Sequence, residues 1–193
     1  MKPDTLLETI RCDGGIAHHL SYHQHRLNTS LSSLGIDSQY NLTNLITPPD
    51  NALYRCRFLY DAFHYTVEYH PYSPKPIRSF RLIHDDTIAY SLKYANRNAL
   101  NKLFDARDGC DDILIVKNGY LTDTTIANIS LFIDNQWFTP ETPLLKGTTR
   151  SRLIDEGKIT PADLNVFDAR NASKIALMNA MTGFVEIENA IIV

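Results

Sequence analysis

The sequence lacks long apolar runs. Its uninterrupted stretches, such as Ile113 to Val116 and Ile175 to Met178, are far shorter than the roughly 20 residues of a membrane span. It also lacks an excess of positive charge, with 19 Lys+Arg, 22 Asp+Glu and a formal net charge of -3. No surplus of cations is left to neutralise a phosphate backbone or an anionic bilayer. We therefore expect no membrane span and no nucleic-acid partner.

Cysteine is scarce and odd in number, because the chain has only Cys12, Cys56 and Cys110. Their wide spacings match neither a disulfide framework nor a zinc site, so we expect reduced, apolar thiols. The opening segment MKPDTLLETIRCDGG has acids and an arginine where a secretory signal needs an apolar stretch. This composition predicts a cytoplasmic protein.

Histidine is locally abundant, yet the pattern does not predict a metal site. His18, His19, His23 and His25 lie close together, but no carboxylate accompanies them at ligand spacing. We expect surface or supporting histidines and no metal. Dinucleotide, phosphate-loop and serine-nucleophile motifs are also missing. The acid pairs Asp85-Asp86 and Asp111-Asp112 adjoin turns, where carboxylates usually cap backbone N–H groups or face water.

The order of predicted elements gives an α+β fold class without a βαβ rhythm. A hairpin over 6–17 precedes a helix that begins at Ser21 and ends at Gly35. Strands are predicted over 53–59, 63–70, 77–83, 113–116, 120–123, 129–133, 137–138 and 174–179, and further helices over 99–104 and 147–157. Three prolines within Pro71 to Pro76 predict a boundary between a small domain, 1–75, and a larger domain, 76–193.

Four single features remain as candidates for chemistry. They are Arg26 in HQHR, Lys93 in SLKYANR, Asp123 in LTDTTIANI, and the turn Gly147-Thr148-Thr149-Arg150 at a predicted helix start. Each has an ordinary alternative, because arginines on helices are usually solvated and a threonine often caps a helix. No one of them identifies a function alone.

Together, these motifs resemble a known family. LETIR, HxxRL, a lysine followed by NR, TDxxxAN, TPxxPLLKGTTR and a final NAM occur in that order between Glu8 and Ile187. The series is similar to the class IV aminotransferases, which include branched-chain aminotransferase, D-amino acid aminotransferase and aminodeoxychorismate lyase. The resemblance implies a two-domain D-amino acid aminotransferase-like fold (fold-type IV) with a shortened N-terminal domain. It also implies pyridoxal 5'-phosphate (PLP), a small-molecule amine substrate and a homodimer.

The resemblance assigns roles to particular residues. Lys93 would hold PLP covalently and then move a proton at the carbon beside that link. Asp123 occupies the position of the acid at the pyridine nitrogen, where the family usually has glutamate. The remaining cofactor contacts would come from Arg26 and the N–H groups of Thr148 and Thr149 at the phosphate, and from Asn179 and Ala180 largely through main chain.

The resemblance favours one reaction without excluding others. KYANR and NAM are most similar to the pattern of 4-amino-4-deoxychorismate lyase, which releases pyruvate and 4-aminobenzoate. An aminotransferase acting on D- or branched-chain amino acids is the alternative. A PLP-binding protein without catalysis is a second alternative, because the small domain is short and Asp123 departs from the family pattern.

Overall fold

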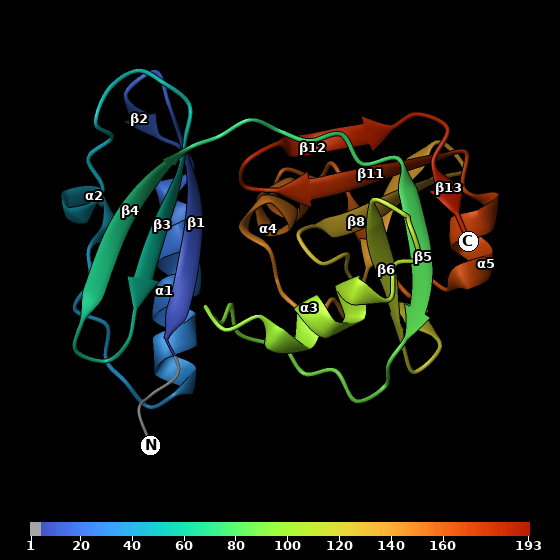
Figure 1. Ribbon diagram of the computed structural model, residues 1–193, viewed down its shortest axis with the longest axis horizontal. Helices are drawn as coiled ribbons and strands as arrows, with labels where there is room; N and C mark the ends of the chain where they lie inside the picture. Colours follow the sequence, from blue (N-terminus) through green and yellow to red (C-terminus); the bar gives the residue numbers. More distant parts are fainter. Residues whose placement is uncertain (1–4) are drawn as a thin grey trace. The chain divides into compact units, whose positions relative to one another are not determined.

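The computed structural model describes residues 5–193, and these form two units (Figure 1). The first unit extends to Pro74 and also includes the short segment Leu92–Asn96. The second unit comprises Lys75–Ser91 and Arg97–Val193. The segment Leu92–Asn96, which the sequence-based division put in the larger domain, therefore groups with the first unit.

The first unit is an antiparallel sheet of order β2-β1-β3-β4 with helices on one face. Its elements in chain order are β1 (Leu6–Asp13), β2 (Ile16–Ala17), α1 (Leu20–Ser33), α2 (Leu42–Leu45), β3 (Tyr54–Tyr60) and β4 (Tyr65–Pro71). Alternate residues of β1 and β3 face α1, so Ile10, Cys56 and Phe58 pack with Leu27 and Leu31 in one apolar core. This core holds β1 and α1 together.

Two local predictions in this unit were wrong. Helix α1 begins at Leu20, and its N-cap is His19 with φ 55°, so Ser21 is not the cap. Gly35 follows the helix with φ 73°, as predicted. A strand was predicted to begin at Phe63, but β4 starts only at Tyr65, and Phe63 is 81% exposed in the hairpin loop. Asp61 fixes that loop by accepting the N–H groups of Phe63 and His64.

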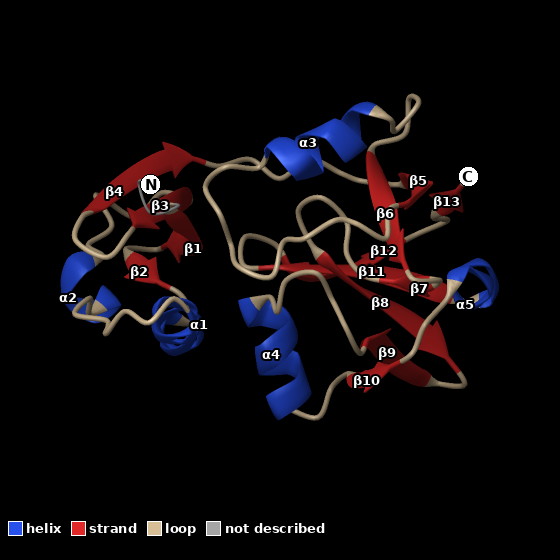
Figure 2. Cartoon of the chain, turned by 90° about the horizontal axis from the view of Figure 1, so that it is seen from below, coloured by secondary structure: helices blue, strands red, loops and turns tan. Residues whose placement is uncertain are grey.

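The second unit contains two sheets, of order β10-β9-β8-β11-β12 and β13-β5-β6-β7. Its elements in chain order are β5 (Ser79–His84), α3 (Asn98–Asp105), β6 (Asp112–Lys117), β7 (Tyr120–Leu121), β8 (Asn128–Ile133), β9 (Gln136–Pro140), α4 (Thr148–Asp155), β10 (Thr160–Ala162), α5 (Val166–Asn171), β11 (Lys174–Asn179), β12 (Gly183–Ile187) and β13 (Ile191–Ile192). Helix α4 packs on β11 through Leu153 and Met178 (Figure 2).

The order of predicted elements showed no βαβ rhythm, yet the structure contains one βαβ unit that was not predicted. Strands β5 and β6 are parallel neighbours connected through α3, which is one βαβ unit. The interior of β6 is apolar throughout, as expected of a strand covered on both faces. Elements α2, α5, β10, β12 and β13 had not been predicted. Among residues 5–193, no helix is both long and apolar enough to cross a membrane.

Candidate functional site

Lys93 lies in the segment that joins the first unit's sheet beside β1. Its carbonyl oxygen accepts the N–H of Leu7 at 2.8 Å, and the next residue, Tyr94, forms a β-bridge with Leu6. The prediction placed Lys93 directly after a strand over 77–83. In the structure β5 ends at His84, and Lys93 is instead held by main-chain pairing to β1. Its backbone is therefore fixed next to the residue that precedes Glu8.

Glu8 connects β1 to two side chains of α1. Its carboxylate is fully buried and accepts Arg26 Nε at 2.8 Å, and a second bond comes from Arg26 Nη2. His23 Nδ1 lies 2.6 Å from Glu8 Oε2, the same oxygen that accepts Arg26 Nη2. His23 and Arg26 are three residues apart on α1, so both face β1. Arg26, expected at a phosphate, is thus held in a bidentate ion pair.

Burial and charge set the protonation of this cluster. Burial alone would raise the pKa of the Glu8 carboxyl, but Arg26 and His23 hold that pKa at about 2. Burial lowers the pKa of the His23 imidazole. The Glu8 carboxylate opposes this shift, and the charges of Arg26 and Lys93 add to it, so the net shift is downward. A neutral His23 therefore donates Nδ1–H to the Glu8 carboxylate.

Asp123 lies in the second unit, in the loop between β7 and β8. One carboxylate oxygen accepts the side-chain amide of Asn128 at 2.8 Å, and the other accepts the N–H of Leu145 at 2.9 Å. The two residues Asp123 and Asn128 also form a β-bridge. The buried acid thereby connects its own loop to the segment that leads into α4.

Gly147 begins α4 in a position that no larger residue could occupy. Its N–H donates to Asn128 Oδ1 at 3.1 Å, and a Cβ at this residue would lie 2.1 Å from that oxygen. No side chain caps the helix, and Thr148 and Thr149 are buried at its first positions. The first N–H groups of an α-helix have no intrahelical acceptor. This helix start therefore offers buried donors of the kind that bind a phosphate.

Arg150 is a functional candidate that the sequence reasoning left unassigned. Its side chain is 5% exposed, and its guanidinium donates to Pro140 O at 2.7 Å and Thr139 Oγ1 at 3.3 Å. Burial lowers its pKa, and the charges of Asp123 and Glu141 oppose that effect. A buried cation thus accompanies the acid and the uncapped helix start. The only signal of this role in the sequence is the position of Arg150 directly after Thr148 and Thr149 in GTTR.

Asn179 and Ala180 follow at the end of β11. Asn179 Oδ1 accepts the N–H groups of Met181 and Thr182, which builds the turn into β12. The preceding residue, Met178, is the strand partner of Asn128. The structure thus gathers Asp123, Thr148, Thr149, Asn179 and Ala180 around Asn128 in the second unit. Arg26 and Lys93 belong to the first unit.

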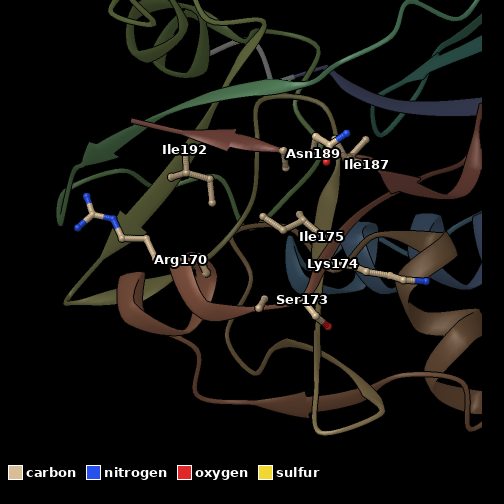
Figure 3. Close-up of a pocket in the computed structure, with 10 residues that line it drawn as sticks. Arg170, Ser173, Lys174, Ile175, Ile187, Asn189 and Ile192 are labelled. Carbon is tan, nitrogen blue, oxygen red and sulfur yellow. The ribbon is translucent and has the colours of Figure 1, made fainter.

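A pocket of about 330 Å³ lies at the opposite end of β11, near Ile175, Ile187 and Ile192 (Figure 3). The charged ends of Arg170 and Lys174 extend to opposite sides of this pocket in the view shown. Polar groups do not converge there, so it is a weaker candidate than the α4 start. Within residues 5–193, no cluster of His, Cys, Asp and Glu could hold a metal ion.

The donor set described above fits a phosphorylated aldehyde such as PLP. In the second unit the buried N–H groups at the start of α4 suit a dianion. In the first unit Lys93 supplies an amine. The chain belongs to the class IV aminotransferase family, whose model matches residues 5–190. The predicted family and the fold-type IV architecture are both confirmed.

Similar proteins are known at several distances. A solved structure from Haemophilus somnus, described as a candidate 4-amino-4-deoxychorismate lyase, is 35% identical with a TM-score of 0.87, covering 95% of this chain and 99% of that one. An uncharacterised Haemophilus influenzae protein is 39% identical over 92% of this chain and 98% of its own length. A candidate aminodeoxychorismate lyase from Schizosaccharomyces pombe is 28% identical, covering 93% of this chain and 87% of that protein.

A PLP-bound structure from Mycobacterium tuberculosis, described as a hypothetical aminotransferase, has the same fold, with a TM-score of 0.81 at 19% identity, covering 99% of this chain and 82% of that one.

Proposed function

We propose that this protein is a PLP-dependent lyase that converts 4-amino-4-deoxychorismate into pyruvate and 4-aminobenzoate. The observation that carries the proposal is the 35% identical Haemophilus somnus structure, which matches nearly the whole chain and is described as a candidate lyase of this kind. The KYANR and NAM motifs support it, because both are most similar to the lyase pattern.

Each part of the site has a task in this reaction. Arg26 and the N–H groups of Thr148 and Thr149 would hold the cofactor phosphate. Asp123 would interact with the pyridine nitrogen of the cofactor, and Lys93 would hold its aldehyde carbon. When bound, PLP would supply an electron sink for the carbon that loses its proton.

Lys93 is the group that would move protons. The positive charge of Lys93 lowers the pKa of His23, which favours a neutral imidazole in the surroundings of an amine that must act as a base. In the net reaction the ring loses a proton, the methylene carbon of the enolpyruvyl group gains one, and the bond between the ring and the enolpyruvyl oxygen breaks. The ring becomes aromatic and pyruvate leaves, so no keto acid is consumed.

The deciding experiment measures pyruvate released from 4-amino-4-deoxychorismate without any added keto acid. We expect many turnovers per protein, complete loss in Lys93→Ala and a reduced rate in Asp123→Asn. Lys102→Ala, an exposed lysine in the last turn of α3, is the matched control and should retain activity.

An aminotransferase gives the opposite pattern. A D- or branched-chain amino acid alone would bleach the cofactor absorption after one turnover, and a keto acid would restore it. That result, with no pyruvate released, would refute the lyase proposal. A protein that binds PLP but does neither would support the non-catalytic alternative.

A further inference from the structure

Arg97 is the last residue of the KYANR motif, and its side chain contacts the loop that carries Asp123. Nη2 of Arg97 donates to the carbonyl oxygen of Thr125, two residues after Asp123. Nε of the same guanidinium is buried and has no partner among the described residues. Arg97 is also the N-cap residue of α3, although its side chain does not cap that helix. The guanidinium therefore acts at the loop rather than at its own helix.

Asp112 holds the same threonine through other atoms. Its Oδ1 accepts Thr125 Oγ1 at 2.7 Å and lies 3.4 Å from Thr125 N. Asp112 is 1% exposed, unlike its neighbour Asp111, which caps N–H groups at the surface as predicted. Burial raises the pKa of the Asp112 carboxyl. Thr125 is thus held at three atoms. Arg97 bonds its carbonyl oxygen, and Asp112 bonds its hydroxyl group and its backbone N–H.

The rest of the loop is closed by Thr124. Its Oγ1 accepts the N–H groups of Ile126 and Ala127, and its own N–H donates to Ala127 O. The loop from Asp123 to Asn128 is therefore held by hydrogen bonds along its whole length. Because the loop is already ordered, little conformational entropy is lost when Asp123 binds a ligand.

We propose that Arg97 is a positioning residue that fixes the Asp123 loop to the start of α3 within the second unit. The inference assigns the arginine of the lyase-like motif to positioning rather than to substrate contact, and it rests on the proposed function for its catalytic meaning.

The first test uses the protein without cofactor. Hydrogen exchange of the peptide covering 122–128 is compared in the wild type, Arg97→Gln and Arg97→Lys. We expect exchange about tenfold faster in Arg97→Gln, because one charge-assisted hydrogen bond is lost, and partial rescue in Arg97→Lys. Arg81→Gln is the control, since Arg81 makes an exposed contact with Asp108 and should leave this peptide unchanged. Equal exchange in Arg97→Gln and the wild type would overturn the proposal.

The second test measures the PLP dissociation constant and the split between kcat and KM. Arg97→Gln should weaken PLP binding by about tenfold and lower kcat. The binding effect should disappear in an Asp123→Asn background, because the arginine acts through that loop. A raised KM with unchanged PLP affinity would make Arg97 a substrate contact and would overturn the proposal. If the wild type binds no PLP, the proposed function fails, and hydrogen exchange still decides the role of Arg97.

Discussion

Replacement of Glu8 by Gln should reduce the loss of stability of the first unit in acid, to which Asp61 and Glu68, whose pKa values are also lowered, still contribute. The ordinary pKa of a glutamate, 4.5, is lowered to about 2 here, which corresponds to about 3 kcal/mol of stabilisation at neutral pH. Because the folded-state pKa is lowered, this contribution is complete above about pH 4.5. It is lost as the pH falls toward 2.

The assay is urea unfolding followed by far-ultraviolet circular dichroism at pH 6 and pH 2.5. The fluorescence of Trp137, the single tryptophan, reports the second unit separately. At pH 6 we expect Glu8→Gln to cost about 3–5 kcal/mol, because it leaves the buried Arg26 charge without a carboxylate. The difference between variant and wild type should shrink by more than about 2 kcal/mol at pH 2.5.

The comparison has an internal control. Glu186→Gln removes an exposed partner of Lys174 and should cost no more than about 1 kcal/mol at pH 6. If the Glu8→Gln difference has the same size at both pH values, the Glu8 carboxylate is not the buried ion that the structure describes, and the argument for a fixed Arg26 fails with it.

Three further outcomes follow from single features. Gly147→Ala should weaken PLP binding by about ten- to a hundredfold in equilibrium titration, because its Cβ would lie 2.1 Å from Asn128 Oδ1; unchanged binding would remove Gly147 from the site. Arg26→Ala should weaken PLP binding by a similar factor, and an unchanged dissociation constant would return Arg26 to a purely structural role. Light scattering should give a dimer, which would cover apolar side chains such as Phe63 and Phe167, 81% and 72% exposed in the chain; a monomer with full activity would contradict this.

The predictable parts of the fold were those with a strong local pattern. Strands β3, β8 and β11 and helices α3 and α4 follow from alternation or helical spacing within one segment. The three short strands β10, β12 and β13 have few residues or no clear alternation, and they are strands because neighbours pair with them. The βαβ unit was hidden because an irregular stretch, 85–97, separates β5 from α3.

The predictable parts of the site were those with a motif. Lys93, Asp123 and GTTR were singled out by their order along the chain, whereas the roles of Glu8 and His23 depend on a contact between β1 and α1. His23 and Arg26 at a spacing of three were visible as one helix face, but their shared carboxylate was not. Asp112 was expected to cap backbone N–H groups or face water because charged residues usually do so, and Arg150 in GTTR was given no role of its own. Only the packed structure shows that both are buried.

The return of Leu92–Asn96 to the first unit has a consequence for how the chain folds during synthesis. The N–H of Leu7 finds its acceptor on Lys93, so the sheet beside β1 stays open at that point until the ribosome has passed residue 96. Docking of that segment closes a loop that contains β5, and β6 lies further along the chain. Part of the entropy of loop closure is then already lost when β6 emerges to pair with β5. A gene fragment cut at Pro74 would instead leave the Leu6–Leu7 edge unpaired, and such edges promote aggregation.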